Sequence, residues 1–511
     1  MRFRVRRLLA GTLLFHTGVF CLLLQHMLHY DDVHQHRSAI GRYIVNRNRT
    51  LNHGNEGEQT TPVLTKILPA MELGDTKHYS TGKTIKDYVA KNNKSVISPK
   101  SVTKETSPHD DNCVPRPQSL RDSDSGDLQT ISHSTRGFVI SATADNVDNI
   151  TGTLHVIALK ETAFAKSTSC VFWSSDPKIV QPISTSDARV ARINEHHGKR
   201  YAAAYFTCNV PYNMKPVGVS LTTQRCENPS NFLPIQYPDK QKWQFTVCVT
   251  PLNFRYSKAY ELVEMIEMNR ILGADHFVFY NYSTHENVDK VLNYYIDIGL
   301  VEVVQWHLPM RVDVWPKVKG HTTEIHYFGQ LGSLNDCLYR NRYKSQYLVY
   351  QDLDEFIFPY KHKNWSEMID SLAKRNVYMF RNTFFRKDWN DTDTMFEGKD
   401  LAKRYKSTIL LKTMREAKIF GLRQRSKYII NPRKVDTVGI HNVWKERSGS
   451  SLLNVPPDVA LIHHYRDWEN PNDKMKREED PIAFQYKEDL LGRLKKVWTT
   501  LKDVKLGPLG F

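Results

Sequence analysis

The chain has 511 residues, which is too long for one ordinary domain and predicts a tail, a stem and about two folded units. A net charge of +16 would ordinarily favour nucleic acid as a partner. The N-terminal segment argues against nucleic acid as a partner, because it predicts that most of the chain lies on the lumenal side of a membrane. An anionic small molecule is then the more natural target for a basic site.

The N-terminal segment has the pattern of a membrane anchor. Four arginines at positions 2, 4, 6 and 7 precede an apolar run that ends near Leu24, and acidic residues follow. We expect residues 1–7 to form a cytosolic tail and residues 8–28 a transmembrane signal-anchor, with the remainder lumenal. The alternative is a cleaved signal peptide, but this run is longer than most signal cores and no small-residue cleavage site follows it.

The cysteines and glycosylation motifs fit a lumenal chain. Beyond the anchor an even number of cysteines, none in a CxxC pair, predicts disulfides rather than zinc. Cys208 could pair with Cys226 or with Cys170, and the sequence leaves this open. Six N-glycosylation motifs point to the same compartment: Asn48, Asn93, Asn149, Asn281, Asn364 and Asn390.

The lumenal part divides by composition. Residues 29–130 are rich in Ser, Thr, Asn and Lys and predict an unpacked stem. Residues 131–240 contain short alternating stretches separated by turn residues, which predicts a small β-sandwich-like accessory domain. We expect it either to bind the acceptor glycan, with Trp173, Tyr201 and Tyr205 stacking on sugar, or simply to cover an apolar face of the next domain.

Residues 241–511 change to an α/β pattern. Strands are expected at 244–250, 276–280 and 300–305, and helices between them at 260–272 and 288–298. The helix over 260–272 is expected to be amphipathic. A further helix over 332–342 leads into a strand over 346–350. This order predicts a parallel sheet with a nucleotide site at the carboxyl ends of its strands.

The last of these strands ends at two acids, Asp352 and Asp354. Ionised carboxylates at the end of a buried strand are costly unless a cation compensates them. Mn²⁺ or Mg²⁺ suits two carboxylates whose partners are diphosphate oxygens, and the metal neutralises the leaving diphosphate. The sequence therefore predicts a metal site here, although solvated surface acids are the usual meaning of such a triplet.

Residues from Trp243 to about Tyr486, roughly half of the chain, resemble glycosyltransferase family 92. The matching stretches are CVTPLNFRYSKAYELVEMIEMNRILGADHFVFYNYS, YLVYQDLDEFIFP, RSKYIINP, VGIHNV and HHYR. Within the family the chain is most similar to vertebrate β-1,4-galactosyltransferases that extend galactose-ended N-glycans. The resemblance implies a GT-A fold, Golgi residence, UDP-galactose as donor, and inversion at the anomeric carbon.

The resemblance also implies particular site residues. Asp352 and Asp354 match the metal motif, and His464 of HHYR would complete the metal shell. The remaining candidates are Arg425, Lys427 and Arg466 for the diphosphate, and Thr250, Pro251, Tyr280 and Asn281 for the nucleoside at the first two strand ends. Packing or solvated roles are the alternatives for His464 and for most of the basic residues.

Inversion requires a base that accepts the proton of the acceptor hydroxyl. Glu416, isolated among cations, is the first candidate and Asp388 the second, with a structural salt bridge as the alternative for both. Two other functions compete: transfer from another UDP-sugar, and a catalytically inactive membrane-anchored lectin. A homodimer is one assembly that we consider.

Overall fold

The computed structural model describes residues 128–145, 152–176, 178–179, 181–210, 214–224, 226–314, 318–447, 451–468 and 474–509, which belong to one compact unit. The expected tail, the anchor and almost all of the stem lie outside these residues. Within the described ranges no helix has the length and apolarity needed to cross a membrane.

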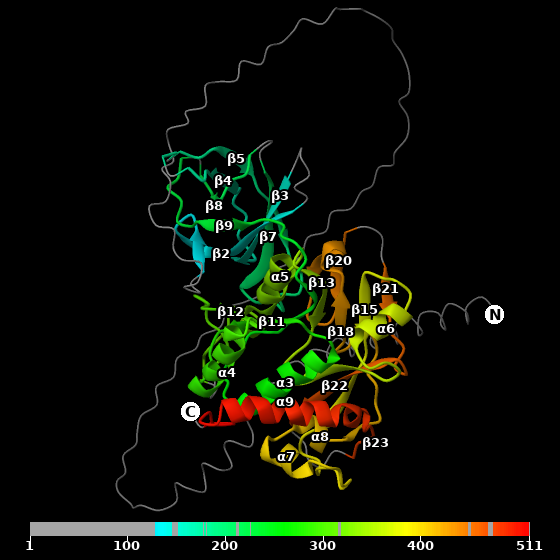
Figure 1. The fold of residues 1–511 in the computed structure, drawn as a ribbon. Helices are drawn as coiled ribbons and strands as arrows, with labels where there is room; N and C mark the ends of the chain where they lie inside the picture. Colours follow the sequence, from blue (N-terminus) through cyan, green and yellow to red (C-terminus); the bar gives the residue numbers. More distant parts are fainter. Residues whose placement is uncertain are drawn as a thin grey trace, which may run out of the picture. The chain divides into compact units, whose positions relative to one another are not determined.

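The first described part is the β-rich region expected from the alternating pattern (Figure 1). Its strands form one hydrogen-bonded sheet in the order β5-β4-β8-β9-β2-β3-β7-β6, with β1 beside β2. The two halves of this sheet share a hydrophobic core, and the Cys170–Cys208 disulfide joins them. The strands are β1 (Gln129–Ile131), β2 (Ser134–Asp145), β3 (Gly152–Glu161), β4 (Ser169–Trp173), β5 (Ser184–Asp187), β6 (Arg189–Arg192), β7 (Tyr201–Val210), β8 (Gly218–Thr222) and β9 (Leu233–Gln236).

The second part is built on a sheet in the order β12-β11-β10-β13-β18-β15-β21. Neighbours from β12 to β13 are parallel, as the sequence predicts, whereas β18 is antiparallel to β13. The elements are β10 (Trp243–Cys248), α3 (Ala259–Leu272), β11 (His276–Asn281), α4 (Glu286–Asp297), β12 (Val301–Gln305), η2 (Tyr327–Gly329), α5 (Gln330–Arg340), β13 (Ser345–Tyr350), β15 (Val377–Phe380), β18 (Lys427–Ile430) and β21 (Leu452–Asn454).

A second sheet, β14-β22-β16-β17-β23, adjoins it, and β19 and β20 form a hairpin. β14 follows β13 directly, so the Asp352–Asp354 turn connects the two sheets. The remaining elements are β14 (Glu355–Pro359), α6 (Trp365–Ser371), β16 (Asn382–Arg386), α7 (Lys399–Arg404), α8 (Thr408–Leu411), β17 (Met414–Glu416), η3 (Pro432–Lys434), β19 (Val435–Val438), β20 (Val443–Glu446), β22 (Ala460–Arg466), β23 (Arg477–Glu479), η4 (Ile482–Tyr486) and α9 (Lys487–Thr500).

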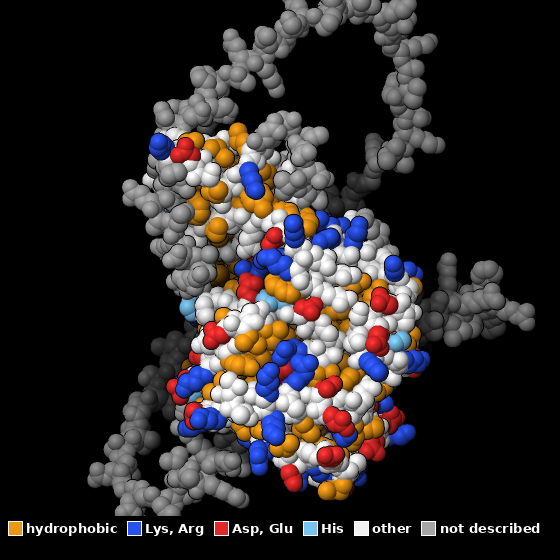
Figure 2. All heavy atoms as spheres, in the orientation of Figure 1, with side chains coloured by type: hydrophobic (Ala, Val, Ile, Leu, Met, Phe, Trp, Pro, Cys, Tyr) orange, Lys and Arg blue, Asp and Glu red, His pale blue; other side chains and the backbone are white. Residues whose placement is uncertain are grey.

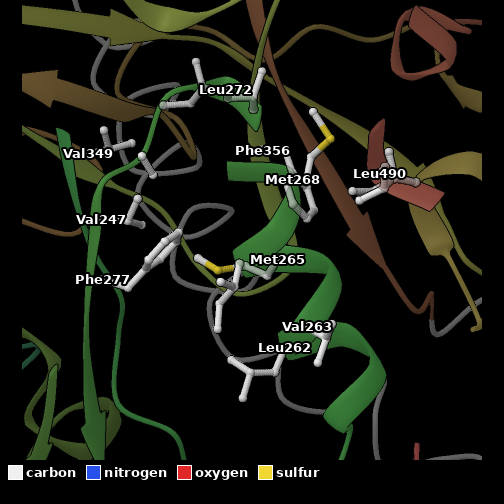
Figure 3. Close-up of a cluster of buried hydrophobic side chains, with 14 of the residues drawn as sticks. Val247, Leu262, Val263, Met265, Met268, Leu272, Phe277, Val349, Phe356 and Leu490 are labelled. Carbon is white, nitrogen blue, oxygen red and sulfur yellow. The ribbon is translucent and has the colours of Figure 1, made fainter. Parts of the chain in front are cut away.

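Alternating side chains of the parallel strands enter two different cores, because successive residues of a strand point to opposite faces. Val247, Phe277 and Val349 belong to the core that contains α3, α4 and α9. Figure 3 shows these three side chains on the side of the strands that faces α3. Their neighbours in sequence, such as Cys248 and Val278, belong to the second core, which contains α5.

The sequence predicts an amphipathic helix for α3, and this prediction is wrong, because most residues of α3 are buried. Helix α9 packs against α3 and covers the side that would otherwise face solvent. The three glutamates Glu261, Glu264 and Glu267 are therefore buried, and each has polar partners. Glu267, for example, accepts a hydrogen bond from Tyr295 and pairs with Arg270.

The β-rich part packs closely against the α/β part, since its side chains enter the second core together with α5. Ile157, Leu159 and Tyr205 are buried in that core with Trp306 and Leu338. Polar contacts reinforce the junction: Tyr205 donates to Asn335, and Ser141 donates to Asp336. These contacts favour the covering role over the tethering role.

A buried ion pair lies at the same junction. Asp145 of β2 pairs with Arg342 at 2.7 Å, and both side chains are almost fully buried. Tyr343 and Arg447 also donate to the Asp145 carboxylate. One carboxylate of the β-rich part therefore holds three donors of the α/β part.

The disulfides confirm one expected pair and exclude the other. Cys170 bonds to Cys208, so the alternative Cys208–Cys226 pair is wrong. Cys226 is also disulfide-bonded. Cys248 of β10 bonds to Cys337 of α5, a pair that the sequence did not single out.

Candidate active site

A cavity of about 270 Å³ opens at the carboxyl ends of β10 and β13, where a parallel sheet is expected to bind a nucleotide. Thr250 and Pro251 follow β10, and the turn from Asp352 to Asp354 follows β13. Other elements supply the remaining walls, which are Leu252, Asn253, Tyr256, Lys258, Glu261, His326, Tyr327, Gln330, Lys387, Ile440, His441, His464, Arg466 and Asp467.

The two acids of the triplet face this cavity. The side chains of Asp352 and Asp354 are 33% and 31% exposed, although the strands on either side of them are buried. Thr250 donates a hydrogen bond to Asp352 at 3.0 Å, which ties the end of β10 to the end of β13. Lys427 of β18 reaches the other oxygen of Asp352 at 2.9 Å.

His464 is held beside Asp354 by the pairing of β14 with β22. The register of these antiparallel strands places His464 opposite Glu355. The imidazole Nδ1 lies 3.1 Å from Oε1 of Glu355, and Nε2 lies 3.5 Å from Oδ2 of Asp354. An imidazole whose Nδ1–H is donated to a carboxylate presents Nε2 to the cavity, which is the usual arrangement of a metal-binding histidine.

The buried Glu355 links these groups. Its carboxylate accepts a hydrogen bond from the backbone N–H of Asp352 at 3.1 Å and lies 3.5 Å from Lys427 Nζ. Together with the contact to His464, these interactions fix both ends of the turn. Glu355 is 1% exposed, so it supports the cavity from behind.

The charges in the turn stabilise one another. Burial alone would raise the pKa of Asp354, but the neighbouring His464 holds that pKa well below its usual range. Burial would likewise raise the pKa of Asp352, and Lys427 lowers it instead. Burial would lower the pKa of His464, yet the Asp354 carboxylate raises it to about 9. Both acids are therefore ionised at neutral pH.

The donor set fits a divalent cation. Asp352, Asp354 and His464 present carboxylate oxygens and one imidazole nitrogen to the same cavity, and such ligands suit Mn²⁺ or, for the oxygens, Mg²⁺. Among the described residues no three or more His, Cys, Asp or Glu side chains are close enough together to hold a metal ion by themselves. A metal at this place would therefore take further ligands from a bound phosphate, as is common for Mg²⁺ in nucleotide sites.

A second charged cluster lines the same cavity. Glu261, in the first turn of α3, pairs with Lys387 and accepts a hydrogen bond from Tyr256 at 2.8 Å. Burial would raise the pKa of Glu261, but Lys258 and Lys387 lower it. The lysines and Arg466 give this side of the cavity positive charge suited to an anionic ligand.

The predicted nucleoside residues separate into two groups. Thr250 and Pro251 line the cavity, but Tyr280 and Asn281 do not. Tyr280 is fully buried, donates to Asp336 and packs edge-on against Trp306, so it is a core residue. Asn281 accepts a hydrogen bond from Thr284 in the turn after β11.

The predicted diphosphate residues also differ in position. Arg466 lines the cavity, with its guanidinium over the rings of Phe384 and Trp468. Lys427 lies behind Asp352 and reaches the cavity through that carboxylate. Arg425 is outside the cavity, because its guanidinium lies over Phe420 at 4.6 Å.

Both predicted bases lie outside the cavity. Glu416 ends β17, is 1% exposed and does not line the cavity. Asp388 is held by Arg386 at 2.9 Å and is also outside the cavity. For Asp388 the ion pair with Arg386 is the structural salt bridge that we considered as the alternative.

The aromatic residues of the β-rich part are unavailable for stacking on sugar. Trp173, Tyr201 and Tyr205 are all buried, with exposures of 0%, 4% and 6%. Trp173 instead donates to Ser220 within its own sheet.

Sequence reasoning missed several residues of the cavity. Glu261, Lys387, His441 and Asp467 line it, yet they belong to four separate segments. Asp467 directly follows the HHYR stretch, and His441 lies within VGIHNV, so closeness to these motifs was the signal available.

The surface outside the cavity has mixed charge. On the face drawn in Figure 2, basic and acidic side chains are interspersed between apolar ones. This face therefore shows no continuous basic stripe that would follow a nucleic-acid backbone.

The α/β part, with its charged cavity, belongs to a protein of the glycosyltransferase class, as the comparisons with known proteins show. Residues 244–502, just over half of the chain, match the model of glycosyltransferase family 92. The chain therefore belongs to glycosyltransferase family 92.

The curated relatives agree with this assignment. "Beta-1,4-galactosyltransferase galt-1" of Caenorhabditis elegans is 24% identical over 66% of this chain and 76% of its own length. "Galactan beta-1,4-galactosyltransferase GALS2" of Arabidopsis thaliana is 26% identical over 37% of this chain and 34% of its own length. Among solved structures, S. aureus TarS in complex with UDP-GlcNAc is 12% identical over 52% of this chain and 68% of that chain, with a TM-score of 0.23, too low to support an argument.

Proposed function

We propose that this protein transfers galactose from UDP-galactose to the terminal β-galactoside of N-glycans, forming a β-1,4 linkage with inversion. The observation that carries the proposal is the cavity that Asp352, Asp354, Lys387 and Arg466 line together. A nucleoside diphosphate is anionic and binds divalent cations, so it is complementary to both sides of this cavity.

The donor and the linkage are supported by the names of relatives. Proteins named for β-1,4-galactosyl transfer occur among both the nematode and the plant matches. The N-glycan acceptor rests on the resemblance of the sequence to vertebrate enzymes of the family. The GT-A arrangement of residues 241–511 is supported by the parallel order β12-β11-β10-β13 and by the acidic triplet after β13.

The metal would be held by Asp352, Asp354 and His464, with Mn²⁺ as the first choice. When bound, it neutralises charge on the leaving diphosphate. Lys427 and Glu355 keep the ligands in place, and Thr250 orients Asp352. Lys258 and Lys387 add positive charge beside the ligand, and Pro251 and Tyr327 contribute to the walls.

The test is a donor panel with the purified full-length chain. UDP-galactose, UDP-glucose and UDP-GlcNAc are offered with a galactose-ended N-glycan, with Mn²⁺ or with EDTA, and the product linkage is read by NMR. We expect a β-1,4-linked galactose product only with UDP-galactose and metal. Transfer of another sugar would show that the donor is not UDP-galactose. Glycan binding without turnover of any donor would favour the alternative function, a catalytically inactive lectin.

We also propose that the chain is a single-pass type II protein of the Golgi membrane. The arginines ahead of the apolar run support this orientation. The intact N-terminus should be recovered from carbonate-washed Golgi membranes. A mature N-terminus near His29 would instead show a cleaved signal peptide.

A further inference from the structure

The cavity must contain a proton acceptor if the sugar is transferred by direct displacement, and both carboxylates expected to act as the base lie outside it. This inference rests on the proposed function. The carboxylates that line the cavity are Asp352, Asp354, Glu261 and Asp467.

Three of the four are already committed. Asp352 is paired with Lys427, and Asp354 with His464. Glu261 is buried, pairs with Lys387 and accepts the Tyr256 hydroxyl. A carboxylate with these partners would have to give up an ion pair to accept a proton.

The imidazoles are less suitable. His464 donates toward Glu355 and faces Asp354, so it belongs to the acidic turn. His441 is buried beside Lys427, whose positive charge opposes the second positive charge that the imidazole would gain with a proton. The ring of His326 is stacked on the ring of His197 at a centroid distance of 3.7 Å. His326 is the alternative candidate for the proton acceptor.

Asp467 differs from the other three acids. It follows β22 directly, is half-buried and lines the cavity. Its carboxylate has no hydrogen bond or ion pair with the rest of the described chain. Its charge acts on Lys387 and Tyr260, which places it on the wall with the positive charge.

We propose that Asp467 is the catalytic base that accepts the proton of the acceptor hydroxyl. The acceptor oxygen forms a bond to the anomeric carbon of the UDP-sugar as its proton passes to the Asp467 carboxylate. The bond from that carbon to the β-phosphate oxygen breaks, and UDP leaves with the electron pair. Neither oxidant nor reductant is required.

The experiment compares Asp467→Asn with the wild-type full-length chain. Without the base, kcat should fall by about 10²- to 10⁴-fold, the usual contribution of general base catalysis. The dissociation constant of UDP with Mn²⁺ should stay within about threefold, because Asn keeps the size of the side chain. Asp393→Asn is the matched control, since Asp393 is exposed and lies outside the cavity.

The outcomes separate the base from the proposed function. A kcat within about threefold of wild type, or a loss of UDP binding that accounts for the lost turnover, would overturn the assignment. So would His326→Gln abolishing turnover while Asp467→Asn remains active. If wild type itself transfers no sugar from any UDP donor, the proposed function has failed before the variant is considered.

Discussion

Buried partners keep Asp352 and Asp354, the two acids of the turn after β13, in their ionised form. Glu355 contacts His464, Lys427 and the backbone of Asp352, and it is almost completely buried. The cavity therefore holds its carboxylates in position before a ligand arrives, which limits the reorganisation required when one binds.

Replacing one of these acids should separate activity from stability. Asp354→Ala is expected to lower galactosyl transfer by more than about 100-fold, since a proposed metal ligand is lost. EDTA should have the same effect on wild type, reversed by Mn²⁺. Transfer assays and thermal melts of the secreted protein measure the two properties. Full activity of the variant, or indifference of wild type to EDTA, would refute the metal hypothesis.

At this scale the sequence identified the acids but not the proton acceptor. Asp352 and Asp354 end a strand whose burial is evident from its apolar residues, so their position at the sheet edge could be predicted. Glu416 was chosen for its isolation among cations along the chain. Neighbours in sequence do not show which face of a short strand such as β17 points inward.

Helix α3 shows how an element can carry buried charge. Glu264 accepts hydrogen bonds from Ser407 and from the backbone N–H groups of Thr408 and Ile409, so it ties α3 to the start of α8. Burial nevertheless raises the pKa of Glu264 to about 7, well above the ordinary value of a glutamate side chain. The folded protein thus favours the protonated form.

This shift predicts a pH dependence of stability. Because the folded-state pKa is raised, the stabilisation is complete below about pH 4.5 and is lost as the pH rises through 7. Relative to Glu264→Gln, the unfolding free energy of wild type should fall by roughly 3 kcal/mol over this range and then level off. Denaturant melts of both proteins at pH 5, 6, 7 and 8 provide the measurement, and a difference that rises with pH would contradict it.

The sequence predicted the elements that obey local periodicity. The alternation of strands and helices from β10 to β13 predicted the parallel strands, because apolar residues repeat with a different period in a helix and in a strand. The antiparallel β18 joins β13 from a distant segment, and nothing in the KYII stretch itself specifies that partner. The amphipathic prediction for α3 failed for the same reason, since α9 lies far along the chain.

On the scale of the whole molecule, one buried carboxylate joins the two parts. Asp145→Ala would leave Arg342 buried without its partner, which should lower the unfolding free energy by about 3–5 kcal/mol. Equilibrium urea unfolding tests this. Asp239→Ala is the control, because it removes a salt bridge whose two side chains are about half exposed. The urea midpoint of this variant should not differ measurably from that of wild type.

The shared core predicts the fate of a truncated chain. Residues 243–511 expressed alone should aggregate, because the α5 face would expose the apolar side chains that the β-rich part covers. Size-exclusion chromatography and transfer to a disaccharide and to a glycoprotein are the measurements. A soluble fragment that keeps disaccharide turnover but loses the glycoprotein would instead support tethering of the acceptor.

The same shared core sets an order on synthesis. The β-rich part leaves the ribosome first, and Tyr205 must wait for Asn335, which lies 130 residues later. At translation rates of about 5–20 residues per second, that delay is roughly 6 to 26 s. During this interval the side chains of β3 and β7 that pack against α5 in the folded protein lack that partner. Apolar surface that is exposed during folding is prone to aggregation, which is the general reason that growing chains need chaperones.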